Sequence, residues 1–232
     1  MSSVDQARAR VRAKSKAGAA PRRGKGRPPS HGLAVGRDAL IAKTCELLKR
    51  RPVNQVTRAA VARAARVDPA TIRYHFPDGQ TLLLAATERL TAGFLDLVER
   101  EMPVKDASPP ERMRARISAL LKLHTANPFF SRLMEEISQM KSAAARKLLA
   151  DLTQRGSRAY TAIVESGVAD GSFHSTNPAL VFLAVVGLCQ YFVTGAPVVR
   201  LALGGNLRQS EIEDQYLEFI CDLLLDSLKR ER

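Results

Sequence analysis

The residues best equipped for chemistry form a short run near position 70. Thr71, Arg73, Tyr74 and His75 lie within five positions of one another, and all four side chains can donate hydrogen bonds. Such side chains on one helix suit the base edges and phosphate oxygens of double-stranded DNA. The run therefore indicates a DNA-binding helix rather than a catalytic site.

Two short helices joined by a turn would position this run. Thr57 is a suitable N-cap for the first helix, and Arg66-Val67 turns the chain. Asp68 caps the second helix, with Pro69 at its first position, where a missing N–H costs nothing. This is the helix-turn-helix arrangement, whose second helix enters the major groove; a plain helical hairpin is the alternative. The residues expected to face inward from the second helix are Ile72 and Phe76.

Other side chains that often carry chemistry are poorly spaced for it. The histidines lack the HxxxH and HExxH spacing of metal sites, and Gly204-Gly205-Asn206 lacks the ending of a phosphate-binding loop. Ser157 and Ser166 lie in no strand-turn-helix elbow. We therefore expect no enzyme, no metal and no cofactor, although a bound metal or turnover of a ligand would reopen the enzyme class. The histidines are His31, His75, His124 and His174.

Cysteine usage and hydropathy limit the class of protein further. Cys45, Cys189 and Cys221 are odd in number and widely spaced, and each lies in an apolar helical stretch, so we interpret them as free core residues. The N-terminus lacks the apolar segment of a secretory signal. The longest apolar run, Ala179–Val193, is too short to span a membrane. These features predict a cytoplasmic protein without membrane contact.

Residues 37–84 resemble the N-terminal domain of the TetR/AcrR family of transcriptional regulators. Three positions depart from the family pattern: Arg66 replaces a turn glycine, Arg73 replaces the usual tyrosine, and Gly79 replaces a lysine that contacts phosphate. A residue other than glycine would be strained at a positive φ, so the turn at Arg66 could differ from the family's. The matching positions are Arg37, Thr57, Val61-Ala62, Ala65, Val67, the run from Asp68 to Ile72, His75-Phe76 and Leu82-Leu83.

The resemblance implies a homodimer that binds a palindromic DNA operator and a small-molecule effector, most simply a repressor released by that effector. We divide the chain into a basic arm (1–36), a three-helix head (37–84) and a body for effector binding and dimerisation (85–232). Effector binding would move the fourth helix and change the spacing of the two heads. The fold is expected to be all-α, with about nine helices. Beyond the two helices described above, helices are predicted at about 37–50, 80–101, 108–125, 127–140, 142–169, 177–194 and 210–229.

The expected DNA contacts surround the second helix of the head. Its N-terminal residues should read bases, and residues around them should contact phosphates. The residues assigned to base readout are Pro69, Ala70, Thr71 and Arg73. Those assigned mainly to phosphates are Thr57, Tyr74 and His75, with assistance from Arg58 and Arg66.

A largely apolar effector pocket is expected between the helices of the body. Aromatic and apolar walls with a few polar groups are typical of ligand pockets, but a packed core has the same composition. Each residue could therefore belong to the core instead, and the pocket itself is implied mainly by the resemblance. The residues assigned to it are Phe94, Leu97, His124, Phe129, Phe130, Met134 and Tyr160.

Dimerisation is assigned to the last two predicted helices. The helix at about 177–194 is apolar on nearly every side, and the helix at about 210–229 carries a continuous apolar stripe. Two copies could form a four-helix interface; alternatively, one subunit could bury the first of these helices by itself. The residues assigned to the interface are Phe182, Val186, Cys189, Phe219, Leu223 and Leu224.

The basic arm carries most of the excess charge. Residues 1–36 hold nine Lys or Arg and one Asp, a charge of +8 out of a net +13. The Gly26-Arg27-Pro28 segment resembles an AT-hook, in which Arg27 would enter a narrow A·T minor groove. Generic attraction to phosphates is the alternative, and a solvated tail is another. A nucleoid-type binder driven by the arm would show weak dependence on DNA sequence.

Deleting residues 1–36 should lower DNA affinity and flatten its salt dependence while preserving operator preference. The slope of log K against log salt scales with the number of phosphates neutralised, and the arm holds most of the net charge. Titrations of operator and scrambled DNA at several salt concentrations measure this slope. An unchanged slope after the deletion would show that the arm does not contact DNA.

Overall fold

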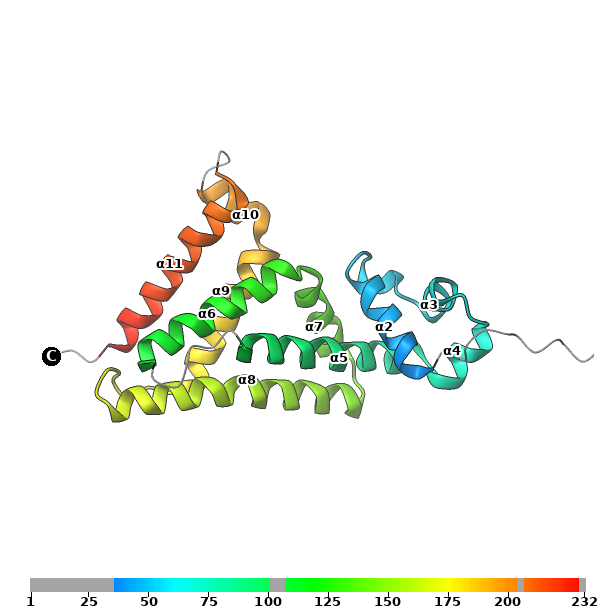
Figure 1. Ribbon diagram of the computed structural model, residues 1–232, viewed down its shortest axis with the longest axis horizontal. Helices are drawn as coiled ribbons and strands as arrows, with labels where there is room; N and C mark the ends of the chain where they lie inside the picture. Colours follow the sequence, from blue (N-terminus) through cyan, green and yellow to red (C-terminus); the bar gives the residue numbers. More distant parts are fainter. Residues whose placement is uncertain (1–35, 101–106, 204–206, 230–232) are drawn as a thin grey trace, which may run out of the picture. The chain divides into compact units, whose positions relative to one another are not determined.

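The computed structural model describes residues 36–100, 107–203 and 207–229, except the side chain of Val98. These residues confirm the all-α fold (Figure 1), and their only β-type pairing is an isolated bridge between Phe173 and Lys229. The predictions for residues 1–35, including Arg27, and for Gly204-Gly205-Asn206 lie outside the described residues.

All nine predicted helices are present in the described part of the chain, and two further elements were not predicted. These are a 3-10 turn, η1 (Val53–Gln55), and α10 (Ala196–Leu203). Pro197 lies in the first turn of α10, where proline is tolerated, so the Gly-Ala-Pro sequence begins a helix as well as ending one. The remaining helices are α2 (Arg37–Leu48), α3 (Arg58–Ala65), α4 (Pro69–His75), α5 (Gly79–Arg100), α6 (Pro109–Ala126), α7 (Phe129–Gln139), α8 (Ala143–Ala169), α9 (Pro178–Thr194) and α11 (Gln209–Leu228).

Asn127 and Ser210, at which two of the predicted helices begin, do not cap those helices. The Asn127 side chain donates to the Leu123 carbonyl at 3.0 Å, so it closes α6 instead of opening α7. Ser210 lies inside α11, whose N-cap is Arg208, because Glu211 accepts the Arg208 backbone N–H at 2.8 Å. Asn127 lies between two helix ends, and both Glu211 and Glu213 have the spacing of a capping box, so the sequence alone does not select the cap.

The core of the head continues into the body. Leu40, Ile72 and Phe76 of the head are almost fully buried in one cluster with Leu133 and Ile137 of α7. Ala145 and Leu148 of α8 belong to the same cluster. The cluster therefore runs from the head through α5 into α7 and α8, and α7 contacts η1 of the head directly.

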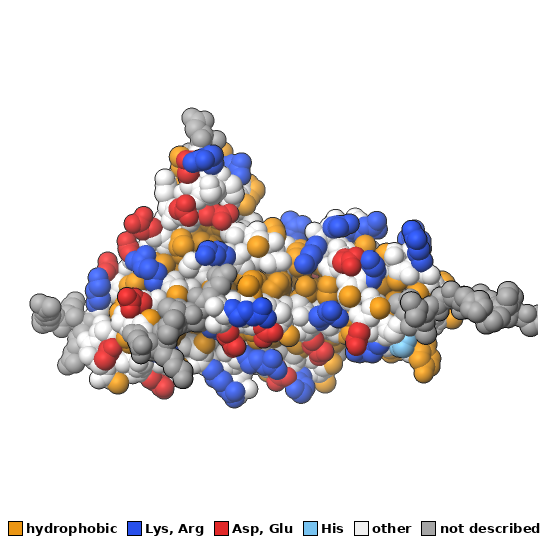
Figure 2. Space-filling view, in the orientation of Figure 1, with side chains coloured by type: hydrophobic (Ala, Val, Ile, Leu, Met, Phe, Trp, Pro, Cys, Tyr) orange, Lys and Arg blue, Asp and Glu red, His pale blue; other side chains and the backbone are white. Residues whose placement is uncertain are grey.

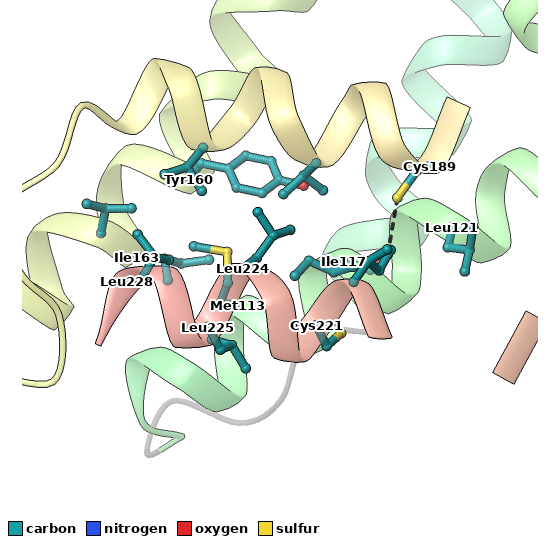
Figure 3. Close-up of a cluster of buried hydrophobic side chains, with 14 of the residues drawn as sticks. Met113, Ile117, Leu121, Tyr160, Ile163, Cys189, Cys221, Leu224, Leu225 and Leu228 are labelled. Carbon is teal, nitrogen blue, oxygen red and sulfur yellow. Dashed lines mark hydrogen bonds between the residues drawn. The ribbon is translucent and has the colours of Figure 1, made fainter. Parts of the chain in front are cut away.

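A second cluster fills the body, where side chains from α6, α8, α9 and α11 point toward one another (Figure 3). The Cys189 thiol donates to the Ile117 carbonyl at 3.9 Å, and burial raises the pKa of Cys189 to about 12. The cysteines are thus free core residues, as predicted. Gly167 allows close packing here, because a Cβ would lie 2.1 Å from the Phe173 ring.

One apolar face of the body is left uncovered by its own subunit. Leu180 and Leu183 of α9 are 62% and 60% exposed, and Phe219 and Leu223 of α11 are 63% and 50% exposed. The alternative in which a single subunit buries α9 is therefore wrong. Leu201 of α10 adds a further apolar side chain, 84% exposed.

Four of the six residues assigned to the interface face the interior of their own subunit. Cys189 and Leu224 lie in the core, and Phe182 and Val186 line a cavity described below. A helix that is apolar on every side gives no sign of which side faces its own subunit. The α9 residues assigned to the interface therefore lie part of a turn away from the exposed face. Phe219 and Leu223 are on the exposed face.

No single helix in the described ranges is long and apolar enough to cross a membrane. Only α9 and α10 taken together have the required length and composition, and they are bent by 85° at their junction.

Replacing Leu223 with Glu should convert a dimer into a monomer. Exposed apolar residues on α9 and α11 would otherwise be buried against the same face of a second copy, and a charge there would have to be desolvated. Sedimentation at micromolar concentration measures the change, and Val168→Glu, at an exposed apolar position of α8, is the matched control. A wild-type monomer that binds a full palindromic operator tightly would contradict this prediction.

Candidate DNA-binding surface and ligand cavity

The turn between α3 and α4 keeps the left-handed conformation that glycine normally provides. Arg66 has φ 54° and ψ 41° and is the only residue other than glycine with positive φ in the described chain. The Arg66 and Val67 N–H groups donate to the carbonyls of Arg63 and Ala62 at 3.2 and 3.0 Å. The expectation of a different turn was therefore wrong: the hydrogen bonds closing α3 hold Arg66 in a conformation that costs about 1 kcal/mol.

The second helix of the motif, α4, presents its polar side chains away from the core. Asp68 accepts the Ala70 N–H at 2.7 Å and caps the helix, as predicted. Arg73 is exposed and Tyr74 is 85% exposed, whereas Thr71 and His75 are half-buried. Pro69 and Ala70 are also exposed. The face predicted to read DNA is therefore accessible, and Lys and Arg side chains are spread over the head (Figure 2).

Arg58 has a structural role that conflicts with its assignment to phosphates. Its Nη1 donates to the backbone carbonyls of Phe76, at 3.2 Å, and Pro77. The side chain thereby ties the start of α3 to the turn after α4. Sequence reasoning missed this contact because it joins positions eighteen and nineteen residues apart. The hydroxyl oxygen of Thr57 accepts the Ala60 N–H at 3.2 Å, which leaves its own O–H available to a phosphate.

The start of α5 carries a carboxylate where the family pattern has a lysine one residue later. Asp78 accepts the Thr81 N–H at 2.7 Å, and this hydrogen bond lowers the pKa of the Asp78 carboxyl. Gly79 has no side chain that could contact a phosphate, as the sequence already indicated. The nearby negative charge of Asp78 disfavours a phosphate at this position further. Gln80 is exposed and is the remaining neutral donor in this first turn.

A cavity of about 500 Å³ lies between α5, α6, α7, α8 and α9. Five of the seven residues assigned to the effector pocket line it: Phe94, His124, Phe130, Met134 and Tyr160.

The other two assignments were wrong. Leu97 is 45% exposed, and Phe129 packs against the cluster under the head. Phe129 directly precedes the lining residue Phe130, and successive helical residues are rotated by about 100°. Leu97 follows the lining residue Leu95 by two positions, a rotation of about 200°.

Several lining residues were missed, and some of them share a helical face with predicted ones. Arg116 and Leu120 precede His124 by eight and four residues on α6, a spacing that places all three along one side of the helix. This spacing is the signal that could have found them. The remaining missed leucine, valine and phenylalanine residues of the wall are Leu95, Leu123, Leu149, Leu152, Phe182 and Val186.

One end of the cavity is a neutral polar corner surrounded by aromatic rings. The Nδ1 atom of His124 lies 3.3 Å from the Ser131 hydroxyl, and its ring lies 6.0 Å from that of Phe130. Phe130 also meets the Phe94 ring edge-on at 5.0 Å. Burial lowers the pKa of His124 to about 4, so its imidazole is neutral at physiological pH.

The cavity is also lined by a buried cation. Arg116 is 7% exposed, and its guanidinium carbon lies 5.6 Å from the centre of the Tyr160 ring. Burial raises the pKa of Tyr160 although Arg116 acts in the opposite direction, so the phenol is neutral. Within the described residues, no group of His, Cys, Asp and Glu side chains could hold a metal ion.

Two family models match this chain. One, described as "Bacterial regulatory proteins, tetR family", matches residues 40–86. The other, described as "Tetracyclin repressor-like, C-terminal domain", matches residues 106–230, more than half of the chain. Together they cover the helix-turn-helix and the whole lining of the cavity except Thr91, Phe94 and Leu95.

Individual relatives are distant. The HTH-type transcriptional repressor NicS of Pseudomonas putida is 22% identical over 173 residues, which are 73% of this chain and 81% of NicS. A solved tetR-family regulatory protein from Rhodococcus RHA1 has a TM-score of 0.65 at 17% identity, covering 87% of this chain and all of that one. AibR, solved with isovaleryl coenzyme A and operator DNA, has a TM-score of 0.60 at 16% identity, covering 82% and 97%. Such structural likeness establishes the fold alone.

His124 should make stability depend on pH. Its folded-state pKa of about 4 lies below its unfolded value of about 6.5, so only the unfolded chain takes up a proton between these values. The contribution of His124 to the free energy of unfolding is complete above pH 6.5, falls as the pH drops and levels off below about pH 4. At pH 5 the loss should be about 2 kcal/mol. Urea unfolding of wild type and His124→Gln measures it; equal pH dependence in the two proteins would contradict the assignment.

Proposed function

Because the chain belongs to the TetR family of bacterial regulatory proteins, we propose that it is a dimeric repressor released from its operator by a small, largely apolar molecule. The chain is a DNA-binding transcriptional regulator that acts as a dimer. Base readout by α4 and ligand binding in the cavity are the parts that we propose. The uncovered apolar face of α9 and α11 supports the pairing of two subunits.

The observation that carries the proposal is that two helices serve both sites. On α7, Ser131 and Met134 line the cavity, whereas Leu133 and Ile137 are buried in the cluster under the head. On α5, Phe94 lines the cavity, and the N-terminal half of the helix packs beneath α2. A ligand that shifts either helix therefore shifts the support of the head.

Release follows from this shared support. In a dimer, the two α4 helices must reach half-sites about one helical turn of DNA apart. A ligand that favours a different position of α5 and α7 changes this separation and weakens operator binding. The coupling free energy is reciprocal, so operator DNA weakens ligand binding by the same factor.

The relatives support this proposal by analogy. NicS is a transcriptional repressor, and AibR was solved with both an acyl ligand and operator DNA. We assign no catalytic role to the cavity, because its buried polar groups are a neutral histidine, two hydroxyls, a phenol and a guanidinium, and its one carboxylate, Glu135, is exposed. A ligand-independent nucleoid-type binder is disfavoured, since such a protein has no use for a cavity connected to its head.

Replacing Arg73 with Ala should weaken operator binding by about 1–3 kcal/mol and relax specificity at one position of each half-site, because a guanidinium at a base edge discriminates between bases. The operator is first isolated by selecting bound fragments from genomic DNA. Fluorescence anisotropy then compares the operator with a scrambled duplex of equal length.

The matched control is Arg155→Ala, which removes the same charge from an exposed position of α8. It should leave operator preference unchanged. Equal losses on the operator and the scrambled duplex would show that Arg73 contacts phosphate, and no preference for any selected fragment would contradict the proposed function itself.

A further inference from the structure

The buried cation of the cavity has no anionic partner. The Arg116 guanidinium is a cation, yet the residue is only 7% exposed to solvent. Among the described residues, no carboxylate lies within the 4.0 Å of an ion pair with it. Its neighbour on the same helix, Arg114, does have such a partner in Asp222, at 2.7 Å.

A buried charge without an opposite charge beside it is unfavourable, and the partner of Arg116 is neutral. The Tyr160 side chain offers Arg116 a cation–π contact with its ring and a hydrogen bond with its phenol, but no negative charge. The phenol is neutral and fully buried, so it does not balance the charge. Arg116 lines the cavity, so a bound molecule can reach its guanidinium.

We propose that the effector is an apolar monocarboxylate whose carboxylate pairs with Arg116; this inference rests on the proposed function of the cavity. Guanidinium and carboxylate are both planar and form two parallel hydrogen bonds. Burial of the pair inside an apolar wall strengthens the attraction relative to water. The bound acid thereby supplies the missing counter-charge.

The other residues that line the cavity determine the chemistry of the rest of the effector. Arg116 and Glu135 are the only charged residues lining the cavity in the described chain, and Glu135 is exposed. A phosphate or a dicarboxylate would need a second cation, and none lines the wall. The body of the ligand must instead be apolar, to match Leu120, Leu152 and Phe182.

The far end of the cavity permits one uncharged polar group. His124 lies eight residues beyond Arg116 on α6, which is about 12 Å along the helix axis. Its neutral imidazole and the Ser131 hydroxyl can exchange hydrogen bonds with a hydroxyl, amide or ring nitrogen. A second charge at this end would be desolvated without compensation.

The test compares acids with neutral molecules of the same shape. Octanoate and 4-phenylbutyrate are titrated into the full-length protein by calorimetry at pH 7.5, beside octanamide and 4-phenylbutanamide. Each acid should bind at least about tenfold more tightly than its amide, because only the acid forms a charge-assisted pair with Arg116. The acids should also release operator DNA, measured by fluorescence anisotropy.

Two variants test whether Arg116 causes the preference for acids over amides. Arg116→Gln should bind acid and amide equally, whereas Arg112→Gln, on the same helix but outside the cavity, should keep the wild-type preference. Cooperative thermal unfolding of both variants confirms that they fold. The comparison of acid and amide on wild type needs no variant and decides the proposal even if Arg116→Gln fails to fold.

The outcomes separate this inference from the function on which it rests. If wild type binds amides as tightly as acids and amides release DNA, the inference that the effector carries a carboxylate is wrong, but the cavity is still the effector site. If neither class binds at about 10 mM, both the inferred carboxylate and the proposed effector cavity are wrong. Operator recognition by α4 does not depend on either result.

Discussion

The packing of Leu133 and Ile137 beneath the head is the contact on which the rest of the arrangement depends. Both side chains are completely buried, and they join a cluster that includes Leu40 and Phe76 of the head. Met134, the residue directly after Leu133, faces the cavity. Because protein cores are densely packed, a side chain displaced on one face of this short helix must displace those on the other. A change in the cavity therefore reaches the head through side chains that are packed directly against one another.

Local sequence signals predicted the helix-turn-helix and most helix ends because the interactions involved are local. The caps at Asp68 and Asn177 each join residues two positions apart. Arg66 is the instructive exception, since its residue type argued against a left-handed turn that the hydrogen bonds around it nevertheless impose. A conformational preference of about 1 kcal/mol is smaller than the free energy of packing two helices.

Predictions that depended on which side of a helix faces which neighbour were less successful. Phe94 and Phe130 were placed correctly in the cavity, whereas Phe129 and Leu97 were not, and in α9 the interior and exterior sides were confused. Periodicity identifies an apolar side only when the opposite side is polar. Arg116 was missed for a related reason: a charged residue on a helix is normally assigned to solvent, and its burial follows from tertiary packing alone.

The core of the body joins α11 to α6, which lie far apart in the sequence, and this determines the order in which the two parts of the chain can fold during synthesis. Leu224 and Leu228 of α11 complete a core begun by Met113 of α6, and the His174 N–H bonds to the Leu228 carbonyl at 2.9 Å. On the ribosome, the head can complete its cluster once Leu148 has emerged, but the body must wait for Leu228. A nascent chain thus presents a folded DNA-reading head before it has a closed cavity or a finished dimer face. Termination of synthesis before α11 would leave a single head without the dimer face or the closed body core.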